Sequence, residues 1–197
     1  ISGNPVAKVD AAELDADVIL LSHAHGDHVS DVLDIAKRTG AMIVCNFEMG
    51  GWYENKGMKN VSAVNPGGSF RNSFLSAKWT VAHHSSSFSD GTYGGQPNGF
   101  IITIGDKKIY FAGDTSLFGD MRLIGEEGIH IAMLPVGDVF TMGIDDSIRA
   151  IKLIEPDKVV PMHYNTFSAI QQDISTWAER VKSETDATPV VLQVEEA

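Results

Sequence analysis

Side chains that bind metal ions are concentrated in one stretch of six residues near the start of the chain. His23, His25 and His28 supply three imidazoles there, and Asp27 supplies a carboxylate. Imidazole nitrogen and carboxylate oxygen suit a borderline cation such as Zn²⁺, and Mn²⁺ and Fe²⁺ accept the same donors. The density and spacing of these donors therefore predict a metal site in preference to a solvated polar loop.

Further candidate ligands occur downstream, and each follows an apolar, β-branched run. The first is His83 or His84, which follows residues 74–82. The other two are Asp114, which follows residues 108–112, and His163, which follows residues 158–162. The early cluster likewise follows residues 18–21. Because functional side chains are often presented at the ends of rigid elements, we expect four strand ends to meet at one rim.

The spacing alone does not decide between His83 and His84. Alternation along a strand places His83 on the more apolar face, with Trp79 and Val81, and leaves His84 on the other face. His130 lies inside an apolar run and matches no motif, so we expect a structural role for it.

The chain alternates short apolar runs with amphipathic segments, which favours an α/β fold of layered sheets and outer helices. We expect strands at Val18–Leu21, Met42–Cys45, Val61–Val64, Phe74–Ala82, Gly99–Ile104, Lys108–Ala112, Ile129–Val136 and Lys158–Met162. We expect helices at residues 30–39 before Gly40, from a cap at Asp145 or Asp146 to Ile154 before Pro156, and at residues 168–181. Residues 105–108 predict the turn of a β-hairpin.

The composition limits the classes of function. A length of 197 residues predicts one domain, residues 1–197. The formal net charge of −11 disfavours nucleic acid and anionic membranes as partners, because both are bound through Lys and Arg. No signal peptide is expected from residues 1–5, and the single cysteine, Cys45, excludes an internal disulfide and predicts a cytoplasmic protein. A small-molecule substrate is the expected partner, and a homo-oligomer is left open.

The motifs together resemble those of the metallo-β-lactamase superfamily of hydrolases. The shared pattern is the H-x-H-x-D-H run at residues 23–28, a downstream histidine at His84, Gly113-Asp114 and a late histidine at His163. A narrower resemblance, over essentially the whole chain, is to the UPF0173 metal-dependent hydrolases, relatives of the ascorbate-phosphate lactonase group. It rests on residues 2–5 (SGNP), 80–86 (TVAHHSS), 111–115 (FAGDT), 140–143 (FTMG) and 161–167 (PMHYNTF).

The resemblance implies a four-layer αββα sandwich. It also implies that the N-terminal strands of the first sheet are lacking, since the family normally has two or more strands before the motif found here at residues 2–5. The family pattern selects His84 over His83. The implied metal ligands are His23, His25 and His84 for a first ion, Asp27, His28 and His163 for a second ion, and Asp114 as the bridge between them.

The implied cofactors are two divalent ions, with Zn²⁺ first and Mn²⁺ or Fe²⁺ as alternatives. Coordination would lower the pKa of a shared water from ~15.7 toward ~7, and the bridging hydroxide would cleave a small ester, lactone, amide or phosphoester. Asp27 and Asp114 are the predicted catalytic residues, Asp27 as a proton acceptor that orients the nucleophile. Ser85, Thr115 and Asn165 are candidates for orienting the ligands. Residues 88–98 are a candidate substrate loop, and Asp138 and Thr141 are candidates for the pocket lining.

Other functions share parts of this pattern. A tRNA-processing nuclease or phosphodiesterase uses the same ligand run, but the acidic composition and the lack of a basic, aromatic platform disfavour it. A redox di-iron protein of this superfamily typically has a carboxylate at the position of His25. The histidine in this chain therefore favours a hydrolytic metal site over a redox one. A non-catalytic metal-binding module is disfavoured by the complete ligand set.

Overall fold

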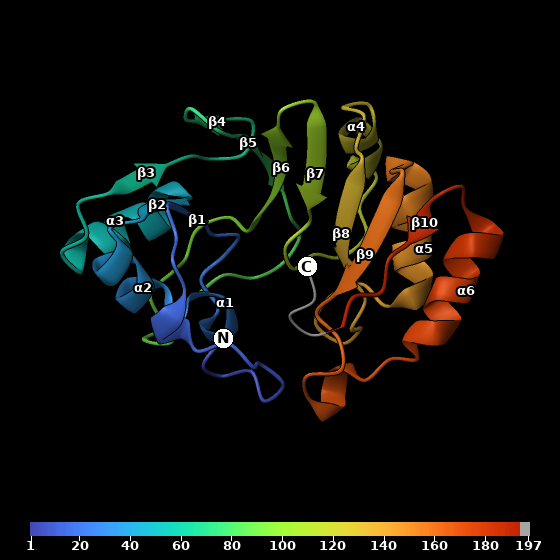
Figure 1. Cartoon of the computed structure of the whole chain (residues 1–197), viewed down its shortest axis with the longest axis horizontal. Helices are drawn as coiled ribbons and strands as arrows, with labels where there is room; N and C mark the ends of the chain where they lie inside the picture. Colours follow the sequence, from blue (N-terminus) through green and yellow to red (C-terminus); the bar gives the residue numbers. More distant parts are fainter. Residues whose placement is uncertain (194–197) are drawn as a thin grey trace.

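The structure, a computed structural model, describes residues 1–193 and consists of two β-sheets packed between two layers of helices (Figure 1). Helices α2 (Val32–Thr39) and α3 (Phe47–Asn55) cover the smaller sheet. Helices α4 (Met121–Gly125), α5 (Ile144–Ile154) and α6 (Ile174–Glu184) cover the larger one. The layer order confirms the predicted αββα sandwich.

The smaller sheet is parallel and has the strand order β1-β2-β3. Its strands are β1 (Val18–Leu20), β2 (Met42–Cys45) and β3 (Val61–Ala63). Parallel neighbours need a crossover connection, and α2 and α3 provide the two crossovers. The short elements η1 (Ala11–Glu13) and α1 (Gly26–Val29) flank β1.

The larger sheet has the strand order β10-β9-β8-β7-β6-β5-β4. Its strands are β4 (Ser69–Arg71), β5 (Ser76–Val81), β6 (Asn98–Ile104), β7 (Lys107–Phe111), β8 (Ile131–Pro135), β9 (Lys158–Met162) and β10 (Thr188–Pro189). Strands β4 to β7 form antiparallel pairs, and β7 to β10 are parallel. Because β6 runs opposite to both neighbours, the carboxyl ends of β5, β7 and β9 lie at the same edge of the sheet.

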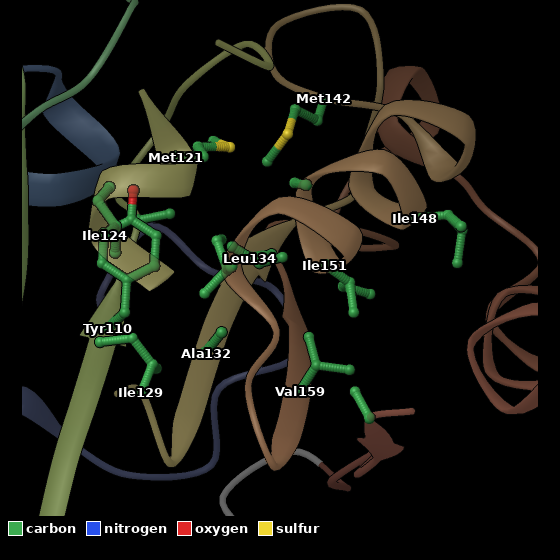
Figure 2. Close-up of a cluster of buried hydrophobic side chains, with 14 of the residues drawn as sticks. Tyr110, Met121, Ile124, Ile129, Ala132, Leu134, Met142, Ile148, Ile151 and Val159 are labelled. Carbon is green, nitrogen blue, oxygen red and sulfur yellow. The ribbon is translucent and has the colours of Figure 1, made fainter. Parts of the chain in front are cut away.

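Apolar side chains fill each interface of the sandwich. Val44 of the smaller sheet meets Trp79 and Phe100 of the larger sheet between the two layers. Figure 2 shows the interface on the other face of the larger sheet, where Leu134 of β8 points toward Ile151 of α5. Full burial of one such side chain contributes about 1.5–3 kcal/mol, so these interfaces fix the strand ends relative to one another.

All eight predicted strands are confirmed, with ends that differ by no more than two residues. The predicted hairpin turn is also confirmed, since Ile104 pairs with Lys107 across Gly105-Asp106. The helix predicted at residues 30–39 is confirmed as α2, which ends at Thr39 with Gly40 as its C-cap. None of the helices within residues 1–193 is long and apolar enough to cross a membrane.

Two predicted helix boundaries were wrong. Helix α5 begins after Gly143, and Asp145 and Asp146 lie in its first turn instead of capping it. Carboxylates in a first turn are still stabilised by the helix dipole. The helix predicted at residues 168–181 is split into a 3₁₀ turn, η2 (Ser168–Ile170), and α6, whose N-cap Asp173 accepts hydrogen bonds from two backbone N–H groups. Helices α1, α3 and α4 and strands β4 and β10 were not predicted.

Candidate metal centre

The seven predicted ligands follow four strands that end near one another. The strands and the residues after them are β1 with His23, His25, Asp27 and His28, β5 with His84, β7 with Asp114, and β9 with His163. Their donor atoms form two groups, and within each group these atoms all lie within 4.8 Å of one another. The first donor group is His23, His25 and His84, and the second donor group is Asp27, His28, Asp114 and His163. The structure therefore brings all seven residues together.

Asp114 connects the two donor groups through a single oxygen atom. Its Oδ2 lies 3.8 Å from Nε2 of His23 and 3.7 Å from Nε2 of His84 in the first group. The same atom lies 3.3 Å from Nε2 of His28 and 3.2 Å from Nε2 of His163 in the second group. The Asp114 side chain is 4% exposed. One buried carboxylate oxygen thus faces histidines from both groups, as a bridging ligand would.

The spacing of the donor atoms fits metal ions. Nitrogen ligands lie about 2.0–2.1 Å from Zn²⁺, so two of them in a tetrahedral site are about 3.4 Å apart. Nε2 of His23 lies 3.1 Å from Nδ1 of His25, close to that separation. The buried Nε2 of His28 has no hydrogen-bond partner, although it points at two carboxylates. Buried polar atoms normally have a partner, and a cation among these donors would supply one.

Electrostatics within the centre keep both carboxylates ionised. Contacts with His163 and then His28 lower the pKa of Asp27. Burial opposes ionisation of Asp114, but the nearby positive charge of His28, at 3.3 Å, outweighs burial and lowers the pKa of Asp114. For His28 itself, burial is outweighed by Asp114 and Asp27, and the pKa rises to about 9. Burial and the charge of His28 lower the pKa of His23 to about 3, which keeps that imidazole neutral, the form that binds metals.

Hydroxyl groups orient several of these side chains. The Ser22 hydroxyl shares a hydrogen bond of 3.0 Å with Nδ1 of His23, which directs Nε2 toward the centre. The Ser85 hydroxyl lies 3.4 Å from Nε2 of His25, as predicted for a residue that orients a ligand. The buried Thr115 hydroxyl accepts a hydrogen bond of 3.0 Å from the N–H of His83 and so connects the loops after β5 and β7. Ser22 was not among the predicted residues, because a serine next to a histidine carries little signal of its own.

Several other candidates lie outside the centre. His83 is exposed and packs on the ring of Phe118, so the choice of His84 agrees with the geometry. His130 lies just before β8, and its Nδ1 accepts the N–H of Lys108, which confirms a structural role. The Asn165 side chain hydrogen-bonds to the backbone of Gln172 in its own loop.

A cavity of about 400 Å³ opens beside the donor groups. It is lined by His25, Asp27, His84, Ser85, Asp114, Phe140, His163 and Phe167. The prediction that Asp138 and Thr141 line it was wrong, and Phe140 between them does so instead. Residues 88–98 do not line it either. Gly94 packs against the loop of the early histidines, where a Cβ atom would lie 2.4 Å from both Ala24 and Ser86.

Comparison with known proteins gives the same family by sequence and the same fold by structure. The model of the β-lactamase superfamily domain matches residues 2–164. A UPF0173 metal-dependent hydrolase from Thermus thermophilus is 50% identical over 92% of this chain and 80% of its own length. The structure of Igni18, a metallo hydrolase from Ignicoccus hospitalis, superposes with a TM-score of 0.89 at 36% identity and covers 98% of this chain and 84% of that one. The metallo-β-lactamase fold protein YhfI from Bacillus subtilis shares the fold, with a TM-score of 0.73 at 15% identity over 95% of this chain and 78% of that one.

Proposed function

Because this chain belongs to the β-lactamase superfamily and, within it, to the UPF0173 metal-dependent hydrolases, we propose that it hydrolyses a small ester, lactone, amide or phosphoester at the centre described above. We further propose two divalent cations, with Zn²⁺ first and Mn²⁺ or Fe²⁺ as alternatives. The observation that carries the proposal is the position of Asp114 Oδ2, within 3.8 Å of histidine nitrogens from both donor groups.

The roles of the seven side chains follow from their positions. His23, His25 and His84 would hold one cation, while Asp27, His28 and His163 would hold the other. Asp114 would be shared, since its oxygen faces both groups. When bound, the cations would supply Lewis acidity, which lowers the pKa of coordinated water and withdraws charge from the scissile group.

Asp27 is the residue best placed to handle the proton. Its side chain is 62% exposed and lines the cavity, whereas Asp114 is 4% exposed. Asp27 is held in place through His28 and His163, at 3.3 and 3.7 Å. An ionised carboxylate at this position can accept a hydrogen bond from the attacking water and take up its proton. Buried Asp114 would instead be the ligand that the two cations share.

The surroundings of the centre favour a small, non-nucleic substrate. Among the described residues, no Lys or Arg lines the cavity, so a polyphosphate or RNA backbone would find no clamp there. The net charge of −11 opposes the same ligands at longer range. We also propose a cytoplasmic location, because the single cysteine is fully buried and needs no oxidising compartment.

The test is turnover by protein loaded with Zn²⁺ or Mn²⁺. The substrates are p-nitrophenyl esters, simple lactones, bis(p-nitrophenyl) phosphate and a structured RNA. We expect cleavage of at least one small ester, lactone or diester, loss of that activity with a chelator, recovery on adding metal back, and intact RNA. Metal-loaded protein that cleaves only the RNA, or nothing in the panel, would contradict the proposal.

A further inference from the structure

Two aromatic rings stand at the mouth of the cavity beside the metal-binding side chains. We propose that Phe140 and Phe167 form an apolar binding surface for the acyl chain of an uncharged ester or lactone, and so make the enzyme prefer longer apolar acyl chains; this rests on the hydrolytic function proposed above. The rings are contributed by two loops of the larger sheet, the first after β8 and the second after β9. The candidate ligands at residues 23–28 come from a different segment, which follows β1.

The exposure of these rings is not explained by the fold. Phe140 is 52% exposed and Phe167 is 47% exposed, and their ring centroids lie 6.2 Å apart. Single exposed aromatic residues occur on most surfaces, and Phe74 is one elsewhere in this chain, at 51%. What distinguishes the pair is that the two rings adjoin each other and line the same cavity as His84, Asp114 and His163. An apolar surface that borders convergent polar groups is the usual composition of a small-molecule site.

The loop that carries Phe140 is held in an unfavourable backbone conformation. Asp138 and Val139 both have positive φ, 63° and 54°, which is rare for a β-branched residue. The conformation is maintained by the Asp138 carboxylate, which accepts the Val139 N–H at 2.8 Å, and by the Asp138 N–H, which donates to Met142 at 3.0 Å. Strain of this kind persists only where surrounding contacts fix it, so the backbone of the loop that carries Phe140 is held in place.

The loop that carries Phe167 is tied to the first loop. The Gln172 side chain donates to the carbonyl of Gly137, at the base of the Phe140 loop, at 3.2 Å. The two backbones also approach closely, since a Cβ atom at Gly137 would lie 2.2 Å from the carbonyl oxygen of His163. The two loops that carry the rings are therefore held against each other before any substrate arrives. A preformed apolar surface loses little conformational entropy on binding, which favours affinity.

The lack of Lys and Arg around the cavity, among the described residues, bears on the class of substrate. Within residues 1–193, the cavity is lined by histidines, two aspartates, a serine and the two phenylalanines, and by no Lys or Arg. With the scissile group placed beside the metal-binding side chains, the rings would face whatever adjoins that group. An apolar acyl chain gains from contact with the rings, whereas a charged group would be desolvated there without a partner.

The experiment compares two esters that differ only in the acyl chain. The kcat/KM of metal-loaded protein is measured for p-nitrophenyl hexanoate and p-nitrophenyl acetate, and the ratio isolates the acyl chain because both carry the same leaving group. The variants are Phe140→Ala, Phe167→Ala and Phe140→Leu. Phe74→Ala is the matched control, since its ring has the same exposure but lies between β4 and β5, away from the cavity. Metal content and circular dichroism are recorded for each protein.

We expect the native ratio to favour hexanoate, and each alanine variant to lower that ratio about tenfold, which is the discrimination typical of small apolar differences in a pocket. Phe140→Leu should keep most of the preference, and Phe74→Ala all of it. A native ratio at or below one, an unchanged ratio in both alanine variants, or equal losses on both esters would overturn the inference. So would cleavage of bis(p-nitrophenyl) phosphate with no cleavage of esters or lactones, an outcome that leaves the hydrolytic function standing. Failure to cleave anything would instead refute the hydrolytic function itself.

Discussion

The two halves of the metal centre are assembled in different ways. Residues 23–28 supply four donors from one short segment after β1, so their mutual geometry is mostly local. His84, Asp114 and His163 come from three strand ends of the larger sheet, and they meet only because β5, β7 and β9 run in the same direction. The first half, residues 23–28, is therefore set by a sequence motif. The second half, His84, Asp114 and His163, is set by the arrangement of strands in the larger sheet. These halves differ from the two donor groups, because Asp27 and His28 of the first half belong to the second donor group. Asp114 belongs to the second half but contacts histidines of both, so the two halves depend on each other through one side chain.

The largest effect is expected from breaking the connection between the halves. Asp114→Ala removes the oxygen that faces both donor groups, and we expect hydrolysis to fall on the order of 10³-fold or more. Metal content should fall below that of the native protein, while circular dichroism should stay native. Asp106→Ala is the control, because that carboxylate is 83% exposed in the β6–β7 turn. Native activity of Asp114→Ala would show that the shared oxygen has no function.

A smaller effect is expected from loosening the local half. Ser22→Ala removes the hydrogen bond to Nδ1 of His23 that helps to orient the imidazole. Loss of such an orienting partner typically costs about 10–100-fold in metal affinity or activity. Competition with a chromophoric chelator would measure the affinity, with Ser89→Ala, an exposed loop serine, as control. Equal affinities for the two variants would mean that His23 is held by packing alone.

Crowding the backbone next to His163 should lower both stability and activity, because His163 belongs to the half that is assembled by the larger sheet. Gly137→Ala places a Cβ atom 2.2 Å from the carbonyl oxygen of His163, so the loops after β8 and β9 must separate. We expect a loss of about 1–3 kcal/mol in the free energy of unfolding and a parallel loss of activity. Urea denaturation would measure the first. Gly119→Ala is matched, because nothing lies within 4 Å of its Cβ position, and it should leave both quantities near native values.

The smallest effect is expected in the scaffold behind the second half. Asp173 caps α6 by accepting hydrogen bonds from the N–H groups of Ser175 and Thr176. Asp173→Ala should cost about 1 kcal/mol of stability, as removal of an N-cap usually does. Metal affinity and kcat/KM should not change, because α6 supplies no donor. A change in metal affinity would contradict this expectation, and would show that α6 affects the positions of His84, Asp114 and His163.

Much of the fold was predictable because its strands are buried and apolar. The eight predicted strands are confirmed for this reason, whereas β4 and β10 are short strands at the two edges of the larger sheet and carry little apolar signal. Helix α3 was missed because Gly50 and Gly51 lower its helix propensity and its apolar residues are not gathered on one face. Asp173 was overlooked as a cap because Ile170 has helical spacing with the apolar residues of α6, although η2 is a separate turn.

The candidate site shows the same division. Residues 23–28 were predictable because the donors are adjacent in the sequence, and the later donors because each follows an apolar strand. The choice of His84 over His83 agrees with the structure, since only His84 lies in a donor group. Phe140 and Phe167 were not assigned to the cavity, because an exposed aromatic in a loop has no periodicity to mark it. Their position depends on how two loops pack, which single-residue patterns do not encode.

The most direct test of the bridged centre is anomalous X-ray scattering from crystals of the metal-loaded protein, recorded at the Zn and Mn absorption edges. The proposal of two cations predicts two peaks per chain, one among His23, His25 and His84 and the other among Asp27, His28 and His163, with Asp114 in contact with both. A single peak, or two peaks of which one lies away from Asp114, would contradict the account.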